Sequence, residues 1–415
     1  MHRTDYRSTL RCCCMCYFAQ AVSVHLSPVL FGVFHRLYGL DFALLGMLAG
    51  ATFLSQLVID LVSAPLCNRL GYRNCMALAL ACCTVGLILL GTLVRITEHA
   101  FAALAASTVC FAVGGGLLEV VVSPVAEAVA DKARTRDAMG LLFSFYSWGQ
   151  TAVVLLTSLT LYFLDDALWY WTAYIWAIAP FVALLGVGSV PFPPHVLCKT
   201  RIRDFRLTPH IALSMAVMLC AGAGEMIVSQ WSSVFAETAL GLPKLLGDLT
   251  GVCAFAACMG LGRLTLALRP PRNPARTMQS SAILLCAAFA MLACVPHAVV
   301  CQLACAVAGW AVSRMWPLTV SECAAHTPHS GPMLFALLAV SGDIGCTLGP
   351  ALLGKVSDWA QTLPQVLMLA ESYGQSAEQV AMRIGIAATF GFPFLLYLCL
   401  CIINAIQKEK SKLRE

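Results

Sequence analysis

The sequence predicts an all-α polytopic membrane protein with twelve transmembrane helices, arranged as two pseudo-symmetric six-helix bundles. The first observation is composition: 60% of the 415 residues are hydrophobic and only 11% are charged, whereas soluble domains carry about 25% charged residues. Second, the apolar residues gather in runs of the roughly 20 residues that a helix needs to span a bilayer. Third, short motifs recur six helices apart along the chain, which indicates an internal duplication.

Interruptions by Gly, Pro and charged residues divide the apolar runs into twelve helices. We expect them near 13–35, 42–66, 74–95, 100–130, 138–163, 169–192, 209–236, 245–268, 277–296, 299–323, 331–357 and 381–406. The polar break at 358–380 is long enough for an additional small surface helix. We divide the chain into an N-terminal six-helix bundle at 1–192, a cytoplasmic basic linker at 193–208 and a C-terminal six-helix bundle at 209–415.

The positions of Lys and Arg predict the orientation of the chain. With the N-terminus inside, the inner segments hold 19 of these residues and the outer segments hold 5. Cytoplasmic loops carry an excess of Lys and Arg, so we expect both termini and the basic linker to face the cytoplasm. The chain is therefore expected to be a multi-pass protein of the inner or plasma membrane. We expect it to be a monomer in the lipid bilayer.

Most of the 21 cysteines fall in apolar segments, where a free cysteine behaves as a small hydrophobic residue. Cys294 and Cys301 flank a short outer turn, so we expect them to be exposed, and whether they pair is left open. The role of the cluster Cys12–Cys16 is also left open, although no second Cys or His pair follows it at zinc spacing. We expect no metal and no cofactor.

Other function classes lack their motifs in this chain. The segment Gly349–Val356 nearly matches a phosphate-binding loop, but Val356 stands where Ser or Thr is required and no strand precedes it. No His-Glu-x-x-His or comparable cluster points to a membrane enzyme. The sequence has no basic segment interspersed with aromatic residues of the kind that binds nucleic acid. We therefore predict that the chain is not an enzyme, binds no nucleic acid and depends on a gradient or on facilitated diffusion.

Three pairs of motifs support the internal duplication. Ser147–Gln150 in the fifth predicted helix corresponds to Val340–Asp343 in the eleventh, and Ala112–Gly115 in the fourth corresponds to Ala306–Gly309 in the tenth. The second and the eighth helices both begin after a Gly-Leu pair. Two related halves around a basic linker are typical of transporters, whose solute site lies between the halves near the membrane midplane.

The segment Ala64–Arg73, between the second and third predicted helices, resembles the loop signature of the major facilitator superfamily, Gly-x-x-x-Asp-Arg-x-Gly-Arg-Arg/Lys. Ala64 stands in place of the first Gly, and Asn68 in place of the Asp. The equivalent segment of the second half is reduced to Gly260–Arg263. The resemblance implies a tight cytoplasmic turn that takes part in gating. The residues that it implies for this gating loop are Asn68, Arg69, Gly71, Arg73 and Arg263.

A narrower resemblance is to the fucose permease branch of that superfamily. It is carried by Gly114–Pro124 and Leu141–Gln150, by Glu225 with Trp231, by Met259–Arg263, and by Gly342–Gly345 with the following Gly349-Pro350. In that branch the glutamate matching Glu119 is implicated in proton coupling, and its companion is an aspartate on the first helix. The first helix here has Gln20 and His25 as its strong polar groups instead. The proline-containing signature of drug exporters is absent from 141–155.

Polar side chains within the predicted spans are the candidates for solute binding and coupling. A charge in the bilayer core costs about 3 kcal/mol on insertion scales and therefore needs a partner or water. We expect Glu119 and Arg314, at similar depths in related helices, to face a central cavity. The amides of Gln150 and Gln230 suit hydroxyl groups, and Trp231 could stack on a sugar ring, although helix packing is the default interpretation of that tryptophan. The candidates for the cavity are Glu119, Arg314, Glu225, Gln150, Asp343, His25, Gln230 and Trp231.

These observations predict a secondary active transporter that moves a small polar solute by alternating access. Uptake of a sugar or related metabolite is favoured, with proton coupling as one possibility. Export of a metabolite or a drug-like compound by the same fold is the alternative. A polytopic membrane enzyme and a non-transporting receptor rank below both.

Overall fold

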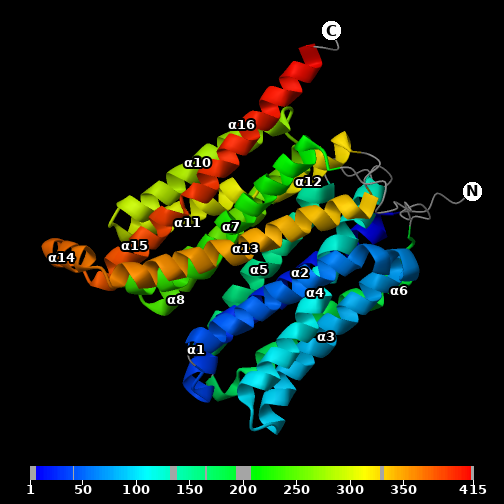
Figure 1. Ribbon diagram of the computed structural model, residues 1–415. Coiled ribbons are helices and arrows are strands. Elements are labelled where there is room, and N and C mark those ends of the chain that lie inside the picture. The colour runs from blue at the N-terminus through cyan, green and yellow to red at the C-terminus, as the bar shows by residue number, and fades with distance from the viewer. Residues whose placement is uncertain are drawn as a thin grey trace, which may run out of the picture. The chain divides into compact units, whose positions relative to one another are not determined.

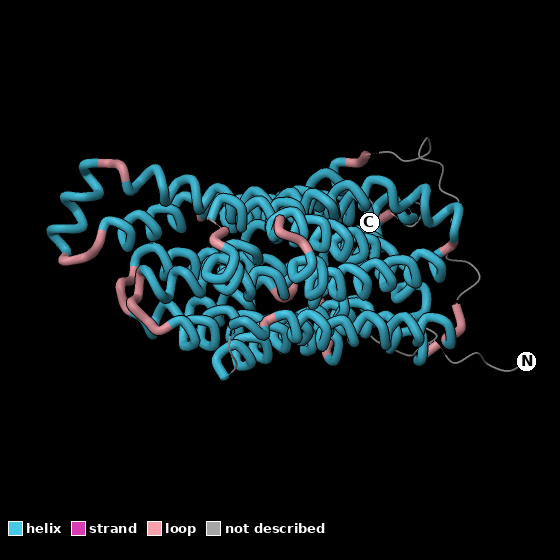
Figure 2. The backbone as a smooth tube through the Cα atoms, turned by 90° about the horizontal axis from the view of Figure 1, so that it is seen from below, coloured by secondary structure: helices cyan, strands magenta, loops and turns pink. Residues whose placement is uncertain are grey.

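The computed structural model describes residues 6–40, 42–130, 138–163, 166–192, 207–327 and 331–412. Throughout these residues the regular structure is helical, and short loops join the helices (Figure 2). The expected basic linker lies outside the described residues except for its last two positions.

The chain forms two compact units, and we describe each by itself. The first unit comprises Met1–Phe205 with the short stretches Leu264–Pro270 and Thr327–Val340. The second unit comprises the remaining residues, from Arg206 to the C-terminus.

Six long helices build the first unit, and they agree with the first six predicted spans to within a few residues (Figure 1). They are α1 (Arg7–Tyr38), α2 (Phe42–Leu70), α3 (Tyr72–Ile96), α4 (Ala100–Ala130), α5 (Ala138–Phe163) and α6 (Tyr170–Ser189). Gly71 separates α2 from α3 with a φ of 78°, a conformation that glycine adopts without steric cost.

Small residues allow the helices of the first unit to approach one another closely. A Cβ atom on Gly86 of α3 would lie 2.5 Å from the backbone nitrogen of Phe111 in α4. A Cβ atom on Gly114 of α4 would lie 2.5 Å from the carbonyl oxygen of Ala79. Such contacts between backbones are the usual way in which membrane helices associate. The buried hydrophobic core of this unit is largely aliphatic and includes the aromatic side chains of Phe34, Phe111 and Trp169.

The second unit contains the remaining helices (Figure 1). They are α7 (Pro209–Thr238), α8 (Lys244–Gly247), α9 (Ala254–Leu268), α10 (Pro274–Cys294), α11 (Ala298–Val312), α12 (Met315–His326), α13 (Gly331–Gln361), α14 (Pro364–Tyr373), α15 (Ala377–Thr389) and α16 (Gly391–Lys412). The first residues of α13 and the last of α9 belong to the first unit. The short helix α14 lies where the sequence predicts a surface helix, and most of its side chains are exposed.

The helices account for all twelve predicted spans. Eleven helical segments of the described chain are long and apolar enough to cross a membrane. The helix α2 adds the shorter apolar stretch Gly50–Ser63. The predicted all-α fold with twelve transmembrane helices is therefore confirmed.

Two helices of the second unit are irregular where the sequence predicts continuous spans. A π-helix occupies Asp248–Cys253, between α8 and α9. The tenth span breaks between α11, which ends at Val312, and α12, which begins at Met315. Such irregularities leave backbone groups that require other partners within a membrane. Both are frequent near functional sites of transporters and enzymes.

The cysteines in the described part of the chain are free thiols. Cys294 is exposed as expected, but the expectation that Cys301 is exposed is wrong. The helix α11 begins before Cys301 and turns its side chain into the core, where Sγ lies 3.1 Å from the carbonyl oxygen of Val295. The cysteines of the Cys12–Cys16 cluster are buried in α1.

Candidate functional site

Glu119 belongs to a small polar cluster between α1 and α4. Its Oε2 atom accepts a hydrogen bond of 2.9 Å from Nε2 of Gln20. The hydroxyl of Tyr17 lies 2.6 Å from Oγ of Ser123 and 3.3 Å from the carbonyl oxygen of Glu119. Gln20, Tyr17 and Ser123 are buried, whereas Glu119 is only partly buried. An uncharged amide therefore positions this carboxyl group, which keeps some accessibility.

His25 and Gln150 lie at the contact between α1 and α5. His25 is buried, and its Nε2 atom lies 3.2 Å from the hydroxyl of Tyr146, with the two rings edge to face. Gln150 is fully buried one turn after Tyr146. The two helices approach closely because Gly149 has no side chain: a Cβ atom there would lie 2.8 Å from Cβ of Ala21.

A buried ion pair joins α7 and α9 in the second unit. Nη2 of Arg263 lies 3.2 Å from Oε2 of Glu225. Their side chains are 1% and 4% exposed, respectively, so solvent screens the pair very little. The indole of Trp316 in α12 lies beside the same carboxylate. The sequence predicts Glu225 for the cavity and Arg263, within the eighth span, for the gating loop; the structure joins the two residues in one ion pair.

Trp316 is enclosed by closely packed glycines. A Cβ atom on Gly342 of α13 would collide with the indole of Trp316. A Cβ atom on Gly222 of α7 would collide with the carbonyl oxygen of Gly342. Trp316, Gly342 and Gly222 therefore fix the relative positions of three helices around the Glu225–Arg263 pair.

Arg314 lies at the break between α11 and α12. Its guanidinium group stacks on the ring of Trp310 at 4.4 Å, and Nη1 donates to the carbonyl oxygen of Trp310 at 3.1 Å. The side chain is only partly buried. Among the described residues, the structure pairs Arg314 with no carboxylate. A cation–π contact of this kind leaves most of the donor capacity of a guanidinium group available.

The remaining candidates for the cavity in the second unit are dispersed. Asp343 is buried in α13, next to the Gly342 contact. Gln230 in α7 is partly buried, and its Nε2 atom lies 3.9 Å from Sδ of Met226. Trp231 is partly buried, and its ring packs where Gly354 of α13 has no side chain.

The residues expected in the gating loop lie at the turn between α2 and α3. Asn68 and Arg69 are exposed. Arg73 donates a short hydrogen bond to the carbonyl oxygen of Val190, just after the end of α6, and its guanidinium group lies 4.9 Å from the ring centre of Phe192. Arg73 therefore caps the C-terminal end of α6, where a cation is electrostatically favourable.

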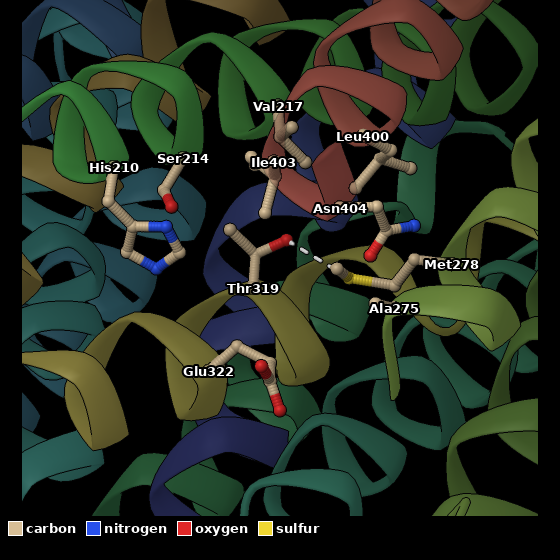
Figure 3. Close-up of a pocket in the computed structure, with 10 residues that line it drawn as sticks. All are labelled: His210, Ser214, Val217, Ala275, Met278, Thr319, Glu322, Leu400, Ile403 and Asn404. Carbon is tan, nitrogen blue, oxygen red and sulfur yellow. Dashed lines mark hydrogen bonds between the residues drawn. The ribbon is translucent and has the colours of Figure 1, made fainter. Parts of the chain in front are cut away.

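A small, partly open pocket lies within the second unit, among the first turns of α7 and α10, the later turns of α12 and the middle of α16. His210 and Ser214 project from α7, Thr319 and Glu322 from α12, and Asn404 from α16 (Figure 3). Its lining includes none of the residues that the sequence predicts for the solute cavity.

Comparison with known proteins identifies the family of this chain. A family model described as Major Facilitator Superfamily matches residues 13–350. The chain belongs to the Major Facilitator Superfamily. No curated protein matches it by sequence at a significant level.

Several solved structures of this superfamily share the fold. FucP in the outward conformation aligns with a TM-score of 0.70 and 16% identity, over 94% of this chain and 98% of FucP. FucP is the fucose:proton symporter of E. coli. The proton:xylose symporter XylE aligns with a TM-score of 0.69 and 12% identity, over 93% of this chain and 94% of XylE. The human organic anion transporter MFSD10 aligns with a TM-score of 0.67 and 15% identity, over 94% of this chain and 99% of MFSD10.

Several residues that shape the sites of this superfamily member carry no signal in the sequence. Tyr17 and Tyr146 are ordinary aromatic residues of apolar helices until packing brings them to Glu119 and His25. Arg383 in α15 donates to the carbonyl oxygens of Leu292 and Val295 at 3.3 and 2.7 Å. It thereby caps the C-terminal end of α10.

The capping contact of Arg73 predicts that the two arginines of the superfamily loop have different roles. We expect Arg73→Ala to lower the stability of the protein by about 1 kcal/mol, because the α6 cap is lost, and also to slow transport. Arg69→Ala should slow transport at unchanged thermal stability and solute affinity, since its side chain is exposed. Thermal unfolding and initial transport rates in proteoliposomes measure both effects. Equal losses of affinity and rate in Arg69→Ala would contradict a gating role.

Proposed function

We propose that this chain is a secondary active transporter that moves a small polar solute across the inner or plasma membrane by alternating access. Uptake of a sugar or related metabolite together with protons is the form we favour. The proposal includes the domain division at 1–192, 193–208 and 209–415, a monomeric state, and cytoplasmic positions for both termini.

The Glu119 cluster is the observation that carries this proposal. Glu119 is a partly accessible carboxyl group within the membrane span Ala100–Ala130. Its Oε2 atom accepts a hydrogen bond from the neutral amide of Gln20. Carboxyl groups within membrane spans are energetically costly and commonly belong to the proton relays of transporters. The similarity to two proton-coupled sugar symporters agrees with this assignment.

Arg314 supports a second candidate function, the export or exchange of an anionic metabolite or drug-like compound. Its guanidinium group is partly accessible and stacks on Trp310. An arginine with unused donors is suited to a carboxylate or a phosphate. Among the solved structures with this fold is an organic anion transporter.

Purified protein in proteoliposomes tests both candidates. We expect a neutral sugar or polyol to accumulate when an inward proton gradient is imposed, and the accumulation to collapse when a protonophore is added. The panel should contain monosaccharides, amino acids and organic anions. Accumulation of organic anions alone would favour the second candidate, and Arg314→Gln should then abolish it.

A thermal-stability screen of the purified protein over the same panel provides an independent measurement. A transported solute stabilises the folded state in proportion to its occupancy. Absence of both transport and stabilisation for every compound would contradict the proposed function.

A further inference from the structure

Two buried polar side chains in the second unit lack hydrogen-bond partners. Gln302 in α11 is 9% exposed, and neither Oε1 nor Nε2 has a partner among the described residues. Ser232 in α7 is 4% exposed, and its hydroxyl also has none. A buried polar group without a partner is strongly unfavourable and is rare in native proteins. Two such groups that converge on one place therefore indicate a missing partner.

The two groups converge at the π-helix. A Cβ atom on Gly251 would lie 3.3 Å from Oε1 of Gln302 and 3.3 Å from Oγ of Ser232. Both polar atoms therefore face the backbone of the π-helix where it has no side chain. Gly247, four residues earlier, would place a Cβ atom 2.9 Å from Cβ of Ala236. Gly247 at the end of α8 and Gly251 in the π-helix thus both face α7, and there is room beside Gly251 because it has no side chain.

A small cavity adjoins this place. Ser232 lines it together with Trp231, Phe235 and Cys305. Cys305 lies one turn after Gln302 in α11, so the two residues occupy neighbouring positions on the same helix face. There is therefore space next to Ser232 for a group the size of a hydroxyl.

We propose that Gln302, Ser232 and Gly251 form a subsite that binds a hydroxyl group of a neutral solute. A hydroxyl group can donate to Oε1 of Gln302 and accept from either Nε2 or the Ser232 hydroxyl. Both residues are uncharged, which suits a neutral group rather than an ion. Trp231 lines the same cavity and offers an apolar surface to the carbon skeleton of the solute. This inference rests on the proposed function and specifies its substrate class as polyhydroxy compounds.

Three variants test the subsite: Gln302→Leu, Ser232→Ala and Gly251→Ala, the last of which fills the space and keeps both polar side chains. We expect each to raise the half-saturation concentration of the transported monosaccharide or polyol by about tenfold or more. The matched control is Ser214→Ala, a buried serine of α7 that lines the separate cavity at His210. The measurement is counterflow exchange in proteoliposomes, with L-fucose, D-xylose and their deoxy analogues as probes.

Gln302→Leu has a second expected effect, because it removes a buried amide that lacks partners. Its solute-free thermal stability should equal or exceed that of the wild type. Unchanged half-saturation concentrations in the three variants would overturn the subsite while leaving the proposed function intact. If the wild type transports none of the probes, the full panel of solutes decides the proposed function, and thermal shifts with the same probes decide the subsite. A shift that is lost in Gln302→Leu supports the subsite, and its retention or its absence from the wild type refutes it.

Discussion

Glu119→Gln is expected to abolish proton-driven accumulation of the solute while solute exchange across the membrane continues. The glutamine amide imitates the protonated carboxyl group in shape and charge, but it cannot release a proton. Its oxygen still accepts the hydrogen bond that Gln20 donates at 2.9 Å to Glu119 in the wild type, so the α1–α4 contact should persist. Exchange requires no net proton movement and should therefore survive.

Two measurements in proteoliposomes separate these effects: uptake under an imposed proton gradient, and counterflow exchange without a gradient. The matched control is Glu371→Gln in the surface helix α14, where an exposed carboxyl group undergoes the same chemical change. This control should leave accumulation unaltered. If Glu119→Gln still accumulates solute against a gradient, Glu119 is structural. His25, Glu225 and Asp343 then become the coupling candidates, or the protein is a uniporter.

The helices of this protein are largely predictable because hydropathy and length determine whether a segment spans a membrane. The predicted helix at 100–130 has the same bounds as α4, and that at 138–163 the same bounds as α5. The surface helix α14 is predictable because Glu371 and its apolar neighbours lie within the long polar break at 358–380. Each of these features depends only on the residue composition of one continuous segment, so it can be inferred directly from the sequence.

The contacts of the candidate site are less predictable because they depend on the rotation of each helix about its axis. Residues in a helix differ by about 100° per position, so an error of one residue directs a side chain to another neighbour. The sequence identifies Glu225 and Arg263 as charges within spans, but not as partners in one ion pair. The convergence of Ser232 and Gln302 depends on the π-helix at Asp248–Cys253, and no feature of that segment indicates a π-helix.

The fold alone does not identify the transported solute. FucP, XylE and MFSD10 share this architecture at 12–16% identity, yet they are transporters of fucose, xylose and organic anions, respectively. Binding specificity depends on a few polar side chains placed on a common scaffold. The assignment of a solute therefore rests on groups such as the Glu119 cluster and Arg314, and on experiments that change them one at a time.

Arg263→Met is expected to destabilise the protein by about 3–5 kcal/mol, the usual cost of removing one partner from a buried ion pair. The Glu225 carboxylate would then remain in an environment where only 4% of its side chain is exposed, without the guanidinium group. Glu225→Leu should be destabilising for the same reason, because it leaves Arg263 without its carboxylate. The double variant should recover most of the loss, since it replaces the pair by apolar side chains.

Thermal unfolding of the purified variants measures these effects, and the Arg36–Asp166 pair of the first unit is the matched control. Its atoms are closer, at 2.8 Å, but its side chains are 54% and 27% exposed. Solvent screens such a pair, so Arg36→Met should cost no more than about 1 kcal/mol. A loss in Arg263→Met as small as this control would contradict a stabilising ion pair and would suggest that Glu225 is protonated in the folded protein. Glu225 would then join Glu119 as a candidate for proton transport, and Glu225→Gln, which imitates the protonated form, should fold at full stability.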